Sequence, residues 1–170
     1  MHVPTKGRVV VIAVAATLFA GNAETLSAQA QGGDIPAIVV YRKALMNTNV
    51  QRLRALRALT SGEIEDREQV RKLASVLAEN GRAMMSQAFA GIHDMFPEGS
   101  MHATSRAIAP IWEKSAEFTE RVRAFAVAAQ DLEQAAQRGS REQIVEAIAA
   151  VGQTCGGCHT EFRGPAPAGS

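Results

Sequence analysis

Two cysteines and a histidine lie within five consecutive residues near the C-terminus of this 170-residue chain, in the segment Cys155-Gly156-Gly157-Cys158-His159. The chain contains no other cysteine. This spacing is the pattern for attachment of a c-type haem. Two thiols can add across the two vinyl groups of a haem, and the adjacent imidazole can then reach the iron as an axial ligand. The segment therefore predicts one covalent haem c, held by Cys155 and Cys158 and ligated by His159.

Three other uses of the cysteine pair compete with haem attachment. A thioredoxin-like redox pair has the same spacing, but it opens a helix that follows a strand, and no strand pattern precedes Cys155. A zinc site needs two further ligands, and His159 is badly placed beside Cys158 to share one metal ion with it. A disulfide between the two cysteines would close a very small loop and constrain the unfolded chain very little. Haem attachment is therefore the preferred interpretation.

The N-terminus has the pattern of an export signal. Lys6 and Arg8 form a basic stretch before an apolar run over residues 9–20, and residues 28–30 supply small side chains for a signal peptidase. The apolar run is short for a membrane span, and the alternative is an N-terminal anchor that stays attached. We expect a signal peptide over residues 1–30, cleaved near Ala30, a periplasmic protein and no stable membrane insertion. Thioether bonds suit that location, because a loosely held haem is easily lost outside the cytoplasm.

The charge balance bounds the class of partner. The chain has 18 Lys and Arg against 17 Asp and Glu, and the leader takes Lys6, Arg8 and Glu24 from these totals. The remainder is close to neutral, whereas a nucleic-acid-binding protein would favour a basic face. We expect no nucleic-acid partner, and any protein partner must recognise a local patch.

The residues after the leader indicate helix throughout, because Ala, Leu, Arg, Glu and Gln dominate. Gly and Pro divide this part into four segments whose apolar residues recur at steps of three and four. The expected helices cover about residues 35–60, 66–95, 106–138 and 140–163, and the third becomes regular only from Pro110. Asp66 with Gln69 and Ser140 with Gln143 are expected to form capping boxes. The sequence predicts an all-α, antiparallel four-helix bundle over residues 31–163 and a flexible tail over 164–170.

The apolar stripes predict which side of each helix faces the core. In the fourth helix the stripe runs through Cys155, Cys158 with His159, and Phe162, so the haem would replace core side chains in the bundle. Gly81 predicts a bend or break in the second helix. The third helix should have a heptad seam at Ile111, Ser115, Phe118, Val122, Phe125, Ala129, Leu132 and Ala136. The predicted core positions of the first helix are Ile38, Tyr41, Leu45, Val50 or Leu53, Leu56 and Leu59.

These features together resemble the cytochrome c-prime family, a class of four-helix-bundle proteins with haem attached near the C-terminus. The resemblance is carried by residues 151–163, 109–113, 96–100 and 41–46, in the family's order. It implies that Cys155 and Cys158 are the thioether cysteines and that His159 is the axial ligand. It also implies that Arg163 is a basic residue near that histidine.

The same resemblance extends to residues that would contact the haem edge. Arg42 matches an arginine that contacts a haem propionate. Lys43 departs from the glutamine often found at the next position, but a lysine can also pair with a propionate. Ser105 and Arg106 fall where the family's second loop meets the haem edge. The alternative for each of these residues is a solvated surface position.

Met46 matches the position that faces the iron on the side opposite the axial histidine. Members of the family differ in the residue at this position. In high-spin members an apolar residue there leaves the iron five-coordinate, so that it accepts nitric oxide or carbon monoxide. In a low-spin branch a methionine ligates the iron, and His–Met ligation raises the reduction potential and suits electron transfer. Some high-spin members also have a methionine, so Met46 as a core residue beside the haem stays open. The resemblance thus implies an electron carrier with His159 and Met46 as metal ligands, and alternatively a gas-binding haem protein.

No enzymatic function is expected, because no nucleophile–base pair, phosphate-binding loop or general acid–base pair stands out. His93 and His102 are expected to be exposed and not ligands, and Trp112 to pack in the core or against the haem. Family members are often homodimers through their first two helices. The resemblance therefore implies a homodimer that docks redox partner proteins.

Overall fold

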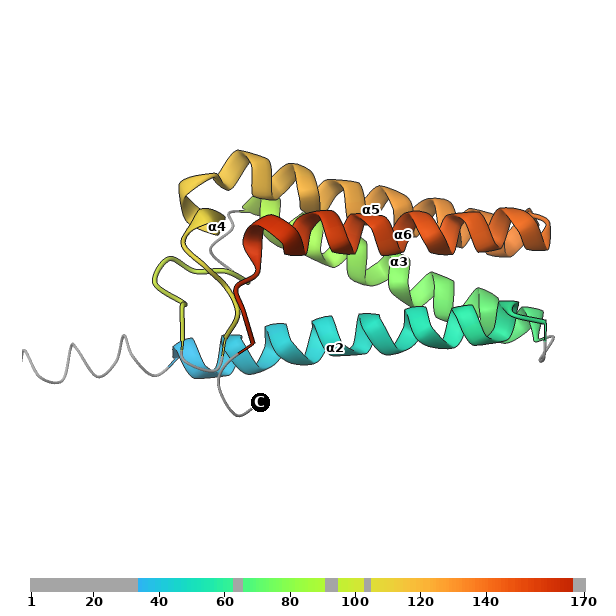
Figure 1. Ribbon diagram of the computed structural model, residues 1–170, viewed down its shortest axis with the longest axis horizontal. Helices are drawn as coiled ribbons and strands as arrows, with labels where there is room; N and C mark the ends of the chain where they lie inside the picture. Colours follow the sequence, from blue (N-terminus) through green and yellow to red (C-terminus); the bar gives the residue numbers. More distant parts are fainter. Residues whose placement is uncertain (1–33, 63–65, 91–94, 103–104, 167–170) are drawn as a thin grey trace, which may run out of the picture. The chain divides into compact units, whose positions relative to one another are not determined.

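Long amphipathic helices pack along their apolar sides in a computed structural model of the chain (Figure 1). They are α2 (Asp34–Thr60), α3 (Arg67–Ala90), α5 (Ser115–Arg138) and α6 (Arg141–Phe162), with the short α4 (Pro110–Glu113) before α5. The structure describes residues 34–62, 66–90, 95–102 and 105–166, all within the unit Asp34–Ser170. The predicted signal peptide, the end of the tail and His93 lie outside these residues.

Consecutive long helices run in opposite directions, so the bundle is antiparallel (Figure 1). Within the described residues the extended pairing is one isolated bridge, between Ala107 and Arg163. The predicted all-α four-helix bundle is confirmed. None of the described helices combines the length and hydropathy that a membrane-spanning segment requires.

The capping box predicted at Ser140 forms in full, and one of the two bonds of the box predicted at Asp66 is present. Asp66 Oδ1 accepts a 2.9 Å hydrogen bond from Gln69 N–H before α3. At α6, Ser140 Oγ accepts from Gln143 N–H, and Ser140 N–H donates to Gln143 Oε1 at 2.8 Å. The reciprocal pair satisfies donors that a helix start leaves without an intrahelical partner. It fixes the register at which α6 begins, and therefore where its last turns end.

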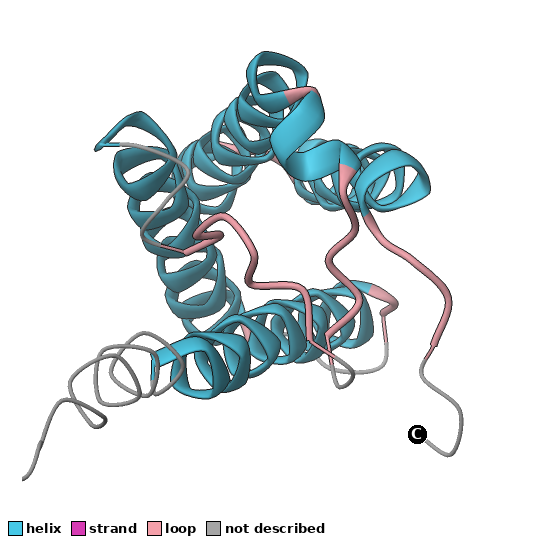
Figure 2. Cartoon of the chain, turned by 90° about the vertical axis from the view of Figure 1, so that its left-hand side faces the viewer, coloured by secondary structure: helices cyan, strands magenta, loops and turns pink. Residues whose placement is uncertain are grey.

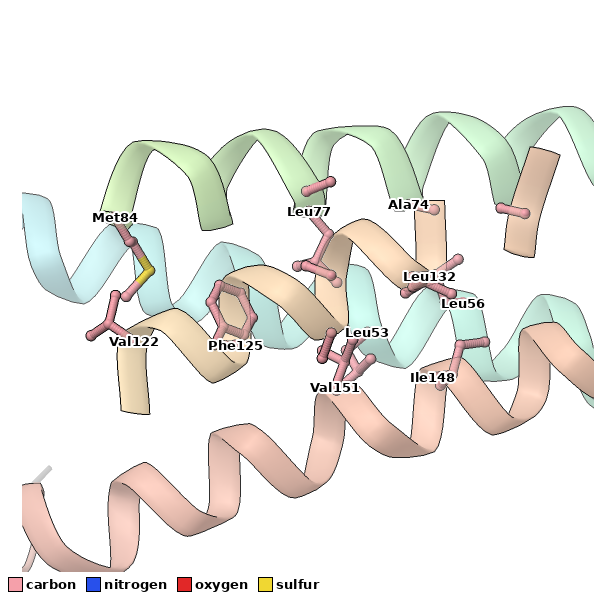
Figure 3. Packing of buried hydrophobic residues seen from close by; sticks show 14 of the residues in the cluster. Leu53, Leu56, Ala74, Leu77, Met84, Val122, Phe125, Leu132, Ile148 and Val151 are labelled. Carbon is pink, nitrogen blue, oxygen red and sulfur yellow. The ribbon is translucent and has the colours of Figure 1, made fainter. Parts of the chain in front are cut away.

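The core lies between α3, α5 and α6, with the C-terminal half of α2 covering it (Figure 3). Gly81 is buried in α3, and a Cβ there would lie 2.9 Å from Ala126 Cα of α5. A break at Gly81 is wrong, because α3 continues through it to Ala90, and the predicted bend stays a prediction. The glycine instead lets the backbones of α3 and α5 approach closely.

The predicted third helix is divided at Lys114. Its φ of −118° and ψ of 47° are not helical, and they separate α4 from α5. The Lys114 ammonium reaches α6, where it donates a 2.7 Å hydrogen bond to Glu161 Oε1. Ser115, predicted on the core seam, is exposed because it directly follows this break. From Phe118 onward the predicted seam is buried as expected.

The core-facing side of α2 follows the prediction in part, because Leu56 is buried and, of the alternatives Val50 and Leu53, it is Leu53 that is buried. Tyr41 is 46% exposed and Val50 39% exposed. The inward stripe instead steps by three and four along α2 through Val39, Arg42, Met46, Asn49, Leu53 and Leu56. Two of its members are polar, so a search for apolar residues misses the stripe. Both are satisfied by partners distant in sequence, because Arg42 donates to Met95, Ser100 and Ser105, and Asn49 Oδ1 accepts a 2.6 Å bond from Asn80 Nδ2 of α3.

The loop before α4 and the last turn of α6 lie at the same end of the bundle (Figures 1 and 2). Figure 2 looks onto this end and shows loop segments crossing between α2 and the other helices. Gly99 has a φ of 76°, in the left-handed region that glycine tolerates best. Its turn carries Ser100 N–H to a 2.9 Å bond with Pro97 O and brings Ser100 into the interior.

Candidate haem site

Cys155, Cys158 and His159 lie in the last turns of α6. Separations of three and four residues make them neighbours on one side of a helix. All three are half-buried, and both cysteines pack against the hydrophobic core. The core-facing position predicted for the two cysteines is therefore confirmed, and residues of the same stripe are buried above and below them, at Val151 and Phe162.

The two cysteines are free thiols and form no disulfide. Burial raises the pKa of the Cys155 thiol, against a smaller opposing effect of Arg57. Burial, and next the neighbouring Cys155, raise the pKa of Cys158 to about 11. At neutral pH the folded chain therefore holds both groups as protonated thiols. They are available to form the two thioether bonds that the spacing predicts.

The surroundings of His159 favour the neutral form of its imidazole. Burial lowers its pKa, and the nearby guanidinium groups of Arg163 and Arg106 lower it further. A neutral imidazole is the form that binds metal ions. The residues present thus fit a haem iron, since two free thiols and a neutral imidazole share one side of a helix beside an apolar core.

The competing uses of the motif gain no support in the described part of the chain. No group of three or more His, Cys, Asp and Glu residues there is arranged to hold a metal ion, as a zinc site would need. The cysteines lie at the end of a long helix, whereas a thioredoxin-like pair opens a helix after a strand. The glycines between them are exposed, and a Cβ on Gly156 would meet nothing within 4 Å.

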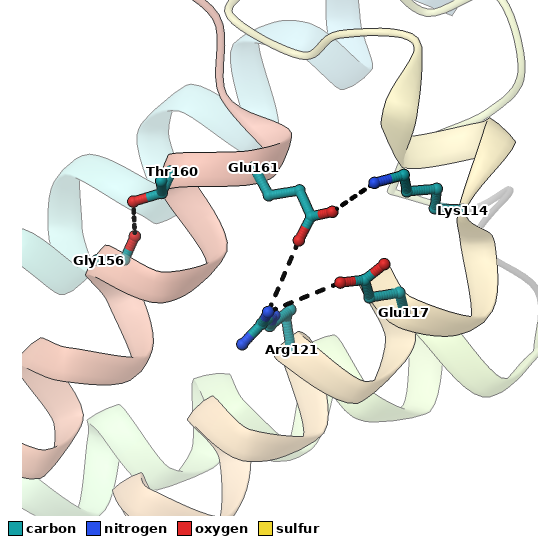
Figure 4. A network of polar contacts seen from close by, with 6 residues as sticks. All are labelled: Lys114, Glu117, Arg121, Gly156, Thr160 and Glu161. Carbon is teal, nitrogen blue, oxygen red and sulfur yellow. Dashed lines mark hydrogen bonds and ion pairs between the residues drawn. The ribbon is translucent and has the colours of Figure 1, made fainter.

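An ion-pair network anchors the last turn of α6 to the α4–α5 junction (Figure 4). Glu161 lies 2.7 Å from Lys114 Nζ and 3.6 Å from Arg121 Nη2, and Arg121 also lies 3.6 Å from Glu117. On the inward side, Phe162 packs edge-on against Phe118 with ring centroids 5.2 Å apart. The charged and aromatic contacts hold the turn that carries His159 from both sides.

Arg42 lies buried at the same end of the bundle and is bonded to the loop that precedes α4. Its Nη1 donates to Met95 O at 3.0 Å and to Ser100 Oγ at 2.7 Å. Its Nη2 donates to Ser100 O at 3.0 Å and to Ser105 Oγ at 3.1 Å. The guanidinium also lies over the ring of Phe96, 4.7 Å from its centroid. Four of the five N–H donors of Arg42 thus hold Met95, Ser100 and Ser105 against α2, and its contact with a propionate stays a prediction.

The other residues predicted to contact the haem are either half-buried or exposed. Ser105 and Arg106 are half-buried in the loop, and Arg106 Nε–H donates to Gly164 O at 2.7 Å. Lys43 and Arg163 are exposed. Met46 is half-buried on the inward stripe of α2 and packs against the core. Their contacts with haem stay predictions.

Two residues of this end were not predicted as part of it. Ser100 is fully buried as the partner of Arg42, and Gly164 is buried as the partner of Arg106. For Ser100, the signal in the sequence is a turn motif that ends in a small hydroxyl residue.

Trp112 is half-buried, packs against the core and donates to Phe96 O at 2.9 Å, in line with its predicted packing role. His102 is exposed, as expected.

Comparison with known proteins places these features in a family. The family described as Cytochrome C' matches residues 37–163. Cytochrome c' of Pararhodospirillum photometricum is 36% identical over 128 residues, which cover 75% of this chain and 96% of that protein. The structure of cytochrome c prime from Shewanella frigidimarina has a TM-score of 0.67 at 24% identity, covering 78% of this chain and 98% of its own.

Another solved cytochrome c', described by an unusual ligand-controlled dimer dissociation, has the same fold. Its TM-score is 0.65 at 21% identity, covering 77% of this chain and 97% of that one. The family match includes the whole haem motif and every long helix of the bundle. The chain therefore belongs to the cytochrome c' family and is a c-type haem protein with one covalent haem c.

Proposed function

We propose that this protein is a periplasmic electron carrier in which Cys155 and Cys158 hold the haem and His159 ligates its iron. The observation that carries the proposal is the placement of two free thiols and a neutral imidazole on the core-facing side of α6. The haem iron supplies a one-electron couple between its ferrous and ferric forms. The proposal assigns no enzymatic reaction to the protein.

The motif is apolar on its core side, and the turn that carries His159 is anchored by contacts on both sides. The two cysteines continue the buried stripe of α6 and pack against the core, so a porphyrin edge bound to them would lie beside apolar residues. The contacts of Glu161 and Phe162 hold the turn of His159 in place. An anchored, apolar site suits electron transfer, because little has to rearrange when the charge on the iron changes.

Met46 is the residue proposed as the second axial ligand. It lies on the inward stripe of α2, one turn beyond Arg42. A thioether opposite an imidazole raises the reduction potential and leaves no open position on the iron. His–Met ligation would therefore favour electron transfer over gas binding.

A second candidate function rests on the packing of Met46. Its side chain contacts the hydrophobic core, as that of an ordinary core methionine does. In that case His159 alone ligates the iron, the opposite position accepts nitric oxide or carbon monoxide, and Met46 acts as a steric gate.

One pair of variants separates the two functions. Met46→Leu conserves volume but removes the sulfur, and Met101→Leu removes an exposed sulfur as the control. Methionine ligation predicts a low-spin ferric spectrum with a sulfur charge-transfer band that is lost only in Met46→Leu. A five-coordinate high-spin spectrum in all three proteins would establish the gas-binding candidate instead.

We also propose that the protein is a homodimer and that it is located in the periplasm. The outward side of α2 exposes Val40, Tyr41 and Val50, which supports a homodimer through this helix. The export pattern of residues 1–30 supports a periplasmic location. Sedimentation of the mature protein tests the dimer, and Val40→Glu should shift it toward the monomer.

A further inference from the structure

We propose that Arg106 is a positioning residue for His159, acting through a two-bond clasp with Gly164 that ties the end of α6 to the loop before α4. The inference rests on the proposed ligation of the iron by His159. It differs from the role at the haem edge that family resemblance suggests for Arg106, because here the residue acts through the backbone of α6.

The clasp follows directly after the last turn of α6. The helix ends at Phe162, and Arg163 is extended, with φ of −124° and ψ of 116°. Arg106 Nε–H donates to Gly164 O at 2.7 Å, and Gly164 N–H donates back to Arg106 O at 2.8 Å. Ala107 and Arg163 form an antiparallel bridge beside these bonds. Side chain and backbone of Arg106 thus both bind one residue, five positions after His159.

The packing at the clasp leaves no room for a side chain. Gly164 is buried, and a Cβ on it would lie 2.8 Å from Ile108 Cγ2. Real Cβ atoms do not come this close to a branched side chain, so alanine would push the two segments apart. Glycine at position 164 is therefore what allows the end of α6 to lie this close to Ile108.

The loop side of the clasp is itself held from α2. Ser105 Oγ accepts hydrogen bonds from Arg42 Nη2 and from Ala107 N–H, both at 3.1 Å. A connected series of bonds thus runs from the buried guanidinium of α2 through residues 105–107 to the end of α6. The segment that binds the end of α6 is therefore itself anchored to α2.

The clasp directly follows the helical turn that contains His159. The last turn of a helix lacks intrahelical partners for its carbonyl groups and frays readily. His159 lies in that last turn, so fraying would tilt its imidazole. The clasp continues the chain from this turn into a paired, extended segment. It therefore limits the orientations that the imidazole can take.

Two substitutions separate positioning from charge. Arg106→Gln removes the side-chain bond of the clasp and a positive charge together, whereas Gly164→Ala disrupts the packing at the clasp with every charge retained. Arg54→Gln on the exposed side of α2 is the matched control for the loss of a positive charge. His159→Gly shows the spectrum without the proposed ligand. The readouts are amide hydrogen exchange at residue 164 and the electron paramagnetic resonance spectrum of the ferric holoprotein.

Positioning predicts that Arg106→Gln and Gly164→Ala both speed exchange at residue 164 by about tenfold or more. Both should also change the ferric spectrum in the same direction, and Arg54→Gln should change neither. A spectrum altered in Arg106→Gln but unchanged in Gly164→Ala would mean a charge effect only and would overturn the inference. Unchanged spectra in both variants, beside an altered one in His159→Gly, would also overturn it. An unchanged spectrum in His159→Gly would instead show that the proposed ligation itself is wrong.

Discussion

Arg42 Nη1 donates a 2.7 Å hydrogen bond to the hydroxyl of Ser100, and both residues are buried. The bond joins the inward face of α2 to a loop more than fifty residues further along the chain. A buried guanidinium is stable only when its donors are satisfied, and the loop supplies acceptors for four of them. The loop that borders the haem end is therefore organised around one side chain of α2.

Replacing Arg42 should destabilise the whole haem end. Arg42→Ala removes the donors that Arg42 supplies to Ser100 Oγ, Ser100 O and Met95 O, and one of the two donors to Ser105 Oγ. We expect a loss of about 3 kcal/mol in the free energy of unfolding. Urea unfolding followed by circular dichroism measures it, with Arg54→Ala on the exposed side of α2 as the control. Equal stability of the two variants would contradict the role of Arg42 as the organiser of this loop.

Gly81 and Gly156 should respond in opposite ways to alanine. At Gly81 the new methyl group would meet Ala126 Cα at 2.9 Å, so Gly81→Ala should cost about 1–3 kcal/mol by forcing α3 and α5 apart. At Gly156 it meets nothing within 4 Å, so Gly156→Ala should gain up to about 1 kcal/mol of helix propensity and keep haem attachment. Thermal unfolding of both holoproteins measures the difference. A gain at both sites would show that α3 and α5 are not in close contact.

The Asn49–Asn80 pair should behave as a coupled unit. Asn49→Leu leaves Asn80 Nδ2 without its partner between α2 and α3, at a cost of about 1–3 kcal/mol. In the double variant Asn49→Leu, Asn80→Leu no polar group is left unpaired, and much of that loss should be recovered. Urea unfolding of the two single variants and the double variant gives the coupling energy. Simple additivity of the two losses would argue against a buried interhelical bond.

The Glu161 carboxylate should titrate below its ordinary range. Its hydrogen bond with Lys114 is the main cause of the lowered pKa, and Arg121 adds a smaller effect. Because the folded pKa is depressed, the stabilisation is present above the unfolded pKa of Glu and is lost as the pH falls through the folded value. Carbon NMR of the carboxyl group follows the titration. Lys114→Met should move its pKa back upward by more than Arg121→Met does, and the reverse order would contradict the geometry.

The sequence was sufficient for the parts of the fold that depend on local pattern. Apolar spacing located the helices, the residues Asp66 and Ser140 marked two starts, and the haem motif identified the face of α6 that meets the core. Each of these features depends on residues that are adjacent or periodically spaced in the sequence. Hydropathy and capping rules describe such residues directly.

The errors arose where a side chain is explained by a distant partner. Arg42 and Asn49 belong to the buried stripe of α2 only because Ser100 and Asn80 satisfy them. From sequence alone, Gly81 predicts a helix break. Its role becomes clear only from the structure, in which it lies against the backbone of Ala126. The clasp of Arg106 with Gly164 pairs two segments more than fifty residues apart, and neither segment has a strand pattern.

The most direct test of the account is the mass and spectrum of the mature protein from an export-competent host with haem-attachment machinery. The account predicts a chain shortened by residues 1–30 that carries one haem through denaturation. A variant with both Cys155→Ala and Cys158→Ala should lose the covalent haem. His159→Gly should keep the haem but lose the wild-type spectrum. A correctly exported wild-type chain without covalent haem would contradict the central claim.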